Sequence, residues 1–165
     1  MGAPRTAGAG VYIWQDVIAE LAYAARFRPD VYQTALLSGT QRVGGTGSAV
    51  LVQGFCELSS VAGPLAFAAE LVSDWTMVVN RLRHASPALK LLGWVTVRRD
   101  SHGLLHDSEQ FVHRTLFNLP HQLTVVLDPV HEKIGVWGAD PQGFLVNLGF
   151  NLVVPQHDIT QAGVP

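Results

Sequence analysis

The stretch "LLGWVTVRRDSHGLLHDSEQFVHRTLF", Leu91 to Phe117, is the most informative part of the chain. Together with the preceding residues 88–90, its first residues form the stretch "ALKLLGWVTVRR". The nearly continuous apolar character of this stretch is typical of a central strand that is covered on both faces. Its last residues, "DSEQFVHRTLF", have the composition of a short helix, which Asp107 or Ser108 is suited to cap. A polar loop with His102 and His106 separates the two. We therefore predict a strand, a loop and a helix in this order.

The sequence on either side predicts two longer helices and further strands. Apolar residues recur every three or four positions through "VYIWQDVIAELAYAARF", which predicts a helix over residues 11–27. A second helix is predicted from Pro64 to about His84, with Pro64 in its first turn. Apolar and β-branched runs predict strands at residues 31–41, 49–59, 121–129, 133–140 and 143–155. The order of these segments predicts an α/β fold, a mixed β-sheet flanked by helices, over residues 11–155. A flexible leader is expected at residues 1–10 and a flexible tail at 156–165.

Composition narrows the classes of function. The chain has 165 residues, 48% of them hydrophobic and 15% charged, and a formal net charge of −2. That charge provides no basic field for nucleic acid and no attraction to an anionic membrane. Cys56 is the only cysteine, so a disulfide framework is excluded. No apolar run approaches the roughly 18 residues of a membrane span, and the start lacks the apolar centre of a signal peptide, so we expect a cytoplasmic protein.

Several phrases, taken together and in order, resemble the MPN/JAMM (Mov34-type) domain family. "LLSG" at 36–39 resembles the end of an early strand of that family, and "LGWVTV" at 92–97 resembles its "VGWYHSH" strand. "HRTLFNLPHQLTVVLDP" and "EKIGVW" resemble the helix and the strands that follow. The resemblance implies a sandwich like that of cytidine deaminases. In active members it implies zinc-dependent cleavage of ubiquitin-like conjugates.

The resemblance also shows where this chain departs from an active enzyme. Active members carry a His-x-His pair and an Asp that hold zinc, a nearby Ser, and a Glu that takes a proton from the metal-bound water. Laid on this chain without gaps, the two His positions become Thr96 and Arg98, the Ser position becomes His106 and the Asp position becomes Glu109. The Glu position becomes Tyr32. A guanidinium does not deprotonate in proteins and repels a dication. The expectation is a catalytically inactive domain with no metal and no cofactor.

Two readings of Arg98 remain open at this stage. It could form an internal ion pair with Glu109 that replaces the metal between strand and helix. Alternatively, it could bind the carboxylate of a ligand or peptide through a forked hydrogen bond. The internal pair is the preferred interpretation.

The remaining reactive side chains suggest no second active site. A rearranged zinc-dependent hydrolase would need His102, His106 and a nearby carboxylate to meet, but i, i+4 spacing brings two histidines together only on a helix. His113 and His121 are expected near helix ends. Cys56 lies in an apolar strand, so a buried and unreactive thiol is expected.

The excess of apolar residues favours a scaffold function in protein–protein interaction. We expect a homodimer or a heterodimer with another MPN-like subunit, formed through the two longer helices. Ordinary core packing is the alternative for each of these residues. The candidate contact residues are Trp14, Leu21, Ala22, Ala25, Leu71, Trp75 and Val79.

Overall fold

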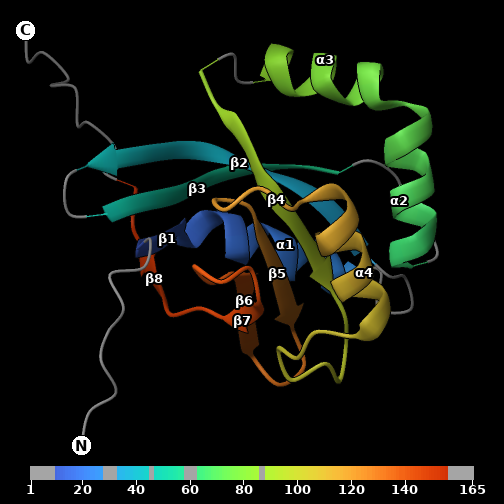
Figure 1. The fold of residues 1–165 in the computed structure, drawn as a ribbon. Helices are drawn as coiled ribbons and strands as arrows, with labels where there is room; N and C mark the ends of the chain where they lie inside the picture. Colours follow the sequence, from blue (N-terminus) through green and yellow to red (C-terminus); the bar gives the residue numbers. More distant parts are fainter. Residues whose placement is uncertain (1–9, 28–32, 45–46, 58–62, 86–87, 156–165) are drawn as a thin grey trace, which may run out of the picture.

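The computed structural model describes residues 10–27, 33–44, 47–57, 63–85 and 88–155 (Figure 1). They form a mixed α/β domain with one curled eight-stranded sheet and four helices. The expected α/β class is therefore confirmed. The predicted leader and tail lie outside the described residues, apart from Gly10. No helix in the described ranges has the length and apolar character needed to cross a membrane.

Along the described part of the chain, one strand and one helix precede the antiparallel strands β2 and β3, and the other three helices and five strands follow them. The elements are β1 (Gly10–Trp14), α1 (Gln15–Phe27), β2 (Gln33–Gly44), β3 (Gly47–Glu57), α2 (Pro64–Ser73), α3 (Trp75–Ala85), β4 (Lys90–Val97), α4 (Asp107–Leu116), β5 (Leu123–Asp128), β6 (Lys133–Ala139), β7 (Leu145–Asn147) and β8 (Phe150–Val153). The strand order in the sheet is β7-β6-β5-β4-β2-β3-β1-β8.

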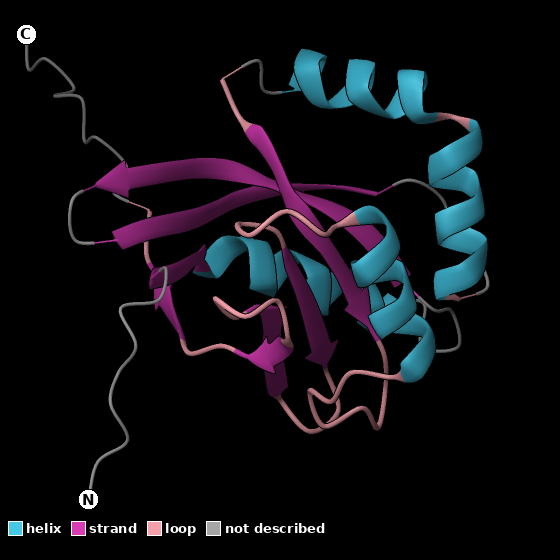
Figure 2. Ribbon diagram, viewed as in Figure 1, coloured by secondary structure: helices cyan, strands magenta, loops and turns pink. Residues whose placement is uncertain are grey.

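The sheet separates two apolar cores. Strands alternate their side chains between the two faces, so Leu36 packs in one core and Leu37 in the other. The first core lies under α1 and includes Val17 and Leu21 of that helix. The second lies under α2, α3 and α4, and Trp94 is at its centre, stacked between Phe67 and Phe117. Figure 2 shows the sheet passing between these two groups of helices.

Two parts of the helix prediction were wrong. Residues 11–14 form strand β1 instead of the start of the first helix. Val11 and Ile13 are buried while Tyr12 between them is exposed, and β1 pairs in parallel with both β3 and β8. The helix predicted from Pro64 to His84 is two helices, because the chain turns at Asp74, which has φ −115° and ψ 24°. Figure 1 shows α3 running away from the end of α2.

Strand β4 occupies the middle of the sheet, as its continuous apolar sequence predicts. It is antiparallel to β2 and parallel to β5, and every residue from Leu92 to Val97 is buried. Gly93 has φ 141°, and a Cβ there would lie 1.9 Å from the Leu123 carbonyl oxygen. Only glycine permits this approach of the two strands. The parallel pairing also brings the carboxyl ends of β4 and β5 to the same edge of the sheet.

Candidate functional site

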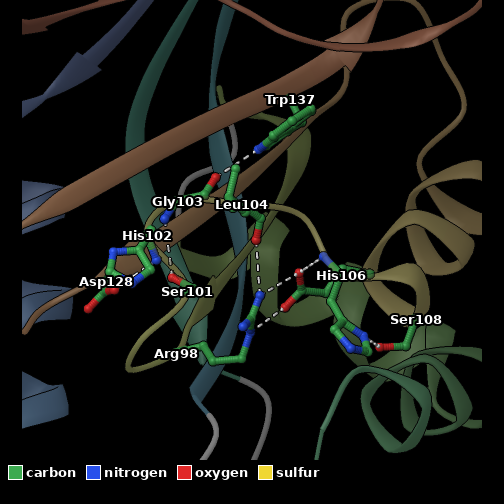
Figure 3. A network of polar contacts seen from close by, with 10 residues as sticks. Arg98, Ser101, His102, Gly103, Leu104, His106, Ser108, Asp128 and Trp137 are labelled. Atoms are coloured by element: carbon green, nitrogen blue, oxygen red, sulfur yellow. Dashed lines mark hydrogen bonds and ion pairs between the residues drawn. The ribbon is translucent and has the colours of Figure 1, made fainter. Parts of the chain in front are cut away.

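The loops that follow β4 and β5 meet at one edge of the sheet and carry the polar residues singled out in the sequence. Figure 2 shows these two loops side by side, and Figure 3 shows residues of the β4–α4 loop together with Asp128 at the end of β5. The β4–α4 loop contains Ser101, His102 and His106, and the β5–β6 turn contains His131. Because β4 and β5 are parallel neighbours, this is the edge where ligand sites of α/β folds usually form.

Arg98 and Glu109 form a two-pronged ion pair between the end of β4 and the first turn of α4. Arg98 Nε donates to Glu109 Oε1 at 3.1 Å, and Nη2 donates to Oε2 at 3.2 Å. The Glu109 side chain is fully buried, whereas that of Arg98 is 26% exposed. The internal ion pair preferred from the sequence is therefore present. A ligand carboxylate would have to displace Glu109 from this fork.

The same two residues also anchor the loop that joins them. Arg98 Nη2 donates to the Leu104 carbonyl oxygen at 3.0 Å, as Figure 3 shows. Glu109 Oε2 accepts from the His106 backbone N–H at 2.7 Å, which satisfies a donor at the start of α4. The residue at the N-cap is thus His106, not Asp107 or Ser108 as predicted. Its ring Nδ1 lies 3.2 Å from the Ser108 hydroxyl.

The other positions of the resembled zinc site provide no ligand set in the described residues. Thr96 is fully buried, and its hydroxyl has no hydrogen-bond partner among the described residues. The same holds for Thr34, its neighbour across the sheet in β2. Tyr32 lies outside the described residues. A neutral threonine hydroxyl and an ion-paired guanidinium are poor substitutes for two imidazoles.

A second cluster, of His102, Asp128 and His131, was not predicted from the sequence. One possible ligand atom from each lies within 4.8 Å of the others. His131 Nδ1 is 3.0 Å from Asp128 Oδ2, and the centroids of the two imidazole rings are 4.1 Å apart. The sequence analysis considered His102 with His106 instead, and His106 is not part of the cluster. No spacing rule could reveal it, since Asp128 is 26 residues from His102.

Asp128 is fixed in this cluster as an ionised, buried carboxylate. Its Oδ1 accepts from the backbone N–H groups of Val130 and His131, and its Oδ2 accepts from the backbone N–H of His102 at 2.8 Å. Burial alone would raise the pKa of Asp128, but these hydrogen bonds and the one from the His131 ring lower it well below its ordinary value. The carboxylate therefore stays charged at neutral pH.

Two glycines allow the β4–α4 loop to pack closely against strand β6, beside Asp128. A Cβ on Gly135 of β6 would lie 1.9 Å from the Gly103 carbonyl oxygen, and Gly103 itself has φ 75°. The same carbonyl accepts a hydrogen bond from Trp137 Nε1 at 3.1 Å (Figure 3). These contacts hold the backbone next to His102 against β6 and so position its ring.

His113 lies in the last turn of α4, near the helix end as expected, and its side chain is buried, with Nδ1 2.7 Å from the Thr124 hydroxyl of β5. Burial, reinforced by the charge of Arg114, lowers the pKa of His113 from 6.5 to about 4. Cys56 is half-buried, not enclosed as predicted. Among the candidate contact residues, Leu21 and Leu71 are core residues, Trp14, Ala22 and Ala25 pack against a core, and Trp75 is exposed.

Comparisons with known proteins give a likeness of fold and no family. No family model matches the sequence, and no curated protein matches it. Among solved structures, the solution structure of protein DSY2949 from Desulfitobacterium hafniense is similar, with a TM-score of 0.54. The two are 14% identical, and the match covers 88% of this chain and 94% of the other. At this identity the likeness shows a shared α/β fold and carries no information on function.

Proposed function

We propose that this chain is a catalytically inactive, MPN-like protein-interaction domain that acts as a scaffold, and that its partner binds on the face formed by α2, α3 and α4. The resemblance noted in the sequence and the order of elements around β4 support the MPN-like part of this proposal. The ion pair between Arg98 and Glu109 supports the absence of hydrolysis. In the gap-free alignment these two residues replace two zinc ligands, and a buried carboxylate paired with a guanidinium is not available to a metal.

The apolar groove between α2 and α4 is the observation that carries the interaction part. It has a volume of about 450 Å³, and its lining includes Ala68 and Val72 of α2 and Phe111 and Leu116 of α4. Val72 is 64% exposed and Phe111 is 56% exposed, so both rims offer uncovered carbon surface. Further exposed large apolar side chains are Leu65 on α2 and Trp75 and Met77 on α3. Grooves of this kind accept the apolar side of an amphipathic helix.

The chain itself contains a helix of the type that such a groove accepts. On helix α3, Trp75 is 46% exposed and Met77 is 42% exposed, whereas Val78 is buried in the second core and Leu82 packs against it. Figure 1 shows α3 extending beyond the body of the domain. A second copy of the chain is therefore the first candidate partner, and a two-fold arrangement would satisfy both copies equally. A related subunit with a similar helix is the alternative partner.

Sedimentation of purified protein over a concentration series tests this proposal. We expect a dimer that dissociates when a charge is placed in the groove by Val72→Asp or Phe111→Asp. Phe144→Asp is the matched control, because Phe144 is 68% exposed and lies in the loop before β7, away from the groove residues. Circular dichroism of each variant checks that the fold is retained.

Two results would overturn the proposal. The first is a wild-type protein that stays monomeric throughout and recovers no partner after cross-linking in its native cells. The second is hydrolysis of a ubiquitin-like isopeptide substrate by tag-free protein supplied with zinc. That result would favour the competing hypothesis of a rearranged zinc hydrolase.

A further inference from the structure

We infer that His102, Asp128 and His131 form a binding site for a divalent transition metal, with zinc as its best-suited ion. Two imidazoles and one carboxylate are a donor set that zinc accepts, with further positions open to water. The site is separate from the residues of the proposed function, because it lies on the β4–α4 loop and the β5–β6 turn.

The spacing of the donor atoms suits a single ion. Zinc bonds to nitrogen and carboxylate oxygen are about 2.0–2.2 Å long, so two such bonds at a tetrahedral angle span about 3.3–3.6 Å, slightly more than the hydrogen-bond distance between two of the donor atoms. His131 Nδ1 and Asp128 Oδ2 are 3.0 Å apart, and a donor of His102 lies within 4.8 Å of both. A metal bound by Nδ1 of His131 and Oδ2 of Asp128 would replace the hydrogen bond between these atoms, with the imidazole in the tautomer that carries its proton on Nε2. A small rotation of the exposed His102 ring would complete the set.

The carboxylate is held in position before any ion arrives. Backbone N–H groups from both loops fix Asp128, which is 0% exposed, while the two histidines remain exposed. A metal could therefore reach the exposed imidazoles of His102 and His131 from solvent and bind to the carboxylate oxygen of Asp128, which is already oriented. Such orientation of a ligand by backbone hydrogen bonds is typical of metal sites.

Charge in the neighbourhood also favours a dication. The Asp100 carboxylate lies 3.8 Å from His131 Nδ1, so a second anion flanks the cluster. The guanidinium of Arg98 points at Glu109 and the Leu104 carbonyl, so its charge is compensated by a carboxylate. Two carboxylates at one cluster attract a cation.

Backbone strain is concentrated in the same two loops. In the described residues, the non-glycine residues with positive φ are Asp100 at 59°, His102 at 52° and Glu132 at 51°. His102 is part of the cluster, Glu132 follows His131 in the chain, and Asp100 lies 3.8 Å from His131 Nδ1. Unfavourable backbone conformations of this kind persist where a site requires a particular side-chain direction.

Isothermal titration of tag-free protein with zinc chloride at neutral pH tests the site. We expect one zinc ion per chain, and an affinity that falls at least about tenfold in His102→Ala and in His131→Ala, since each removes one of three ligands. Both side chains are exposed, so both variants should fold. Substitution by cobalt gives a second readout, because its visible absorption reports the ligand set.

His106→Ala and His84→Ala are the matched controls, and neither should change binding. His106 lies in the same loop outside the cluster, and His84 lies on α3. Gly135→Ala tests positioning: its Cβ would displace Gly103 and so weaken binding without removing a ligand. The inference fails if wild-type protein takes up no stoichiometric zinc, if His102→Ala and His131→Ala bind as wild type does, or if His106→Ala is the variant that loses binding.

Discussion

At the scale of single residues, Arg98 is the residue that connects the edge of the sheet to α4 and to the loop between them. Its side chain is long enough to reach both oxygens of Glu109 and a loop carbonyl at once. Lysine could not replace this planar fork, because an ammonium offers no paired parallel donors. The guanidinium thus joins β4, the following loop and α4 through polar contacts, where the resembled enzymes use a metal.

Replacing Arg98 and Glu109 singly and together should show that their contributions to stability are coupled. We predict that Arg98→Ala lowers the free energy of unfolding by about 2–3 kcal/mol, because it removes the cation from a buried carboxylate at a partly exposed site. Glu109→Ala should cost at least as much, since it also removes the hydrogen bond to the His106 N–H. The double variant Arg98→Met/Glu109→Leu should lose less than the sum of the two single variants. Urea unfolding measures all three, and strictly additive losses would contradict a coupled pair.

At the scale of elements, side chains from distant segments decide how the helices and strands are placed. The sequence predicts β4, α4 and β5 well, because the apolar runs of β4 and β5 suit strands covered on both faces and "DSEQFVHRTLF" has the composition of a short helix. It does not predict β1, because Val11 and Ile13 precede a strongly amphipathic helix and their pairing partners lie in β3 and β8. The break at Asp74 is equally hidden, since both helices continue the same apolar pattern and contribute to the same core.

The contact of α4 with β5 should make stability depend on pH. His113 is 3% exposed and has a pKa of about 4, so the unfolded chain takes up a proton between pH 6.5 and 4 that the folded chain does not. Stability should therefore fall on acidification through this window, by on the order of 3 kcal/mol from this residue. His113→Asn should remove that part of the pH dependence, while His84→Asn on exposed α3 should leave it unchanged. Denaturation at a series of pH values measures the difference, and parallel curves for wild type and His113→Asn would refute the role of His113.

At the scale of the whole molecule, one sheet is shared by two cores. Residues of β2 and β4 face both sides in alternation, so neither core can lose its packing without disturbing strands that the other needs. The domain expected over residues 11–155 should then unfold as a unit. The eight-stranded sheet shared by both cores gives this expectation its physical basis.

Weakening one core should lower the stability of the entire domain. Phe67→Ala removes a ring whose centroid lies 5.2 Å from that of Trp94, and we predict a loss of about 3–5 kcal/mol. Circular dichroism, which follows all helices and strands, and tryptophan fluorescence, which includes Trp14 beside the other core, should still change together. Two separated transitions would show instead that the cores unfold independently.

The sequence by itself determined the α/β class and most of the strands, because these depend on local apolar patterns. It favoured the Arg98–Glu109 pair through the alignment with the resembled family, and the structure contains this pair. The tertiary structure alone decided that His102 meets Asp128 and His131, that His113 is buried, and which apolar helix faces stay uncovered. The parallel register of β4 and β5 brings two loops together that are separated by a helix, and no local pattern encodes that register. Burial in turn depends on which elements pack on each other, so the predicted contact residues Leu21 and Leu71 lie in the cores while Val72 and Phe111 line an open groove.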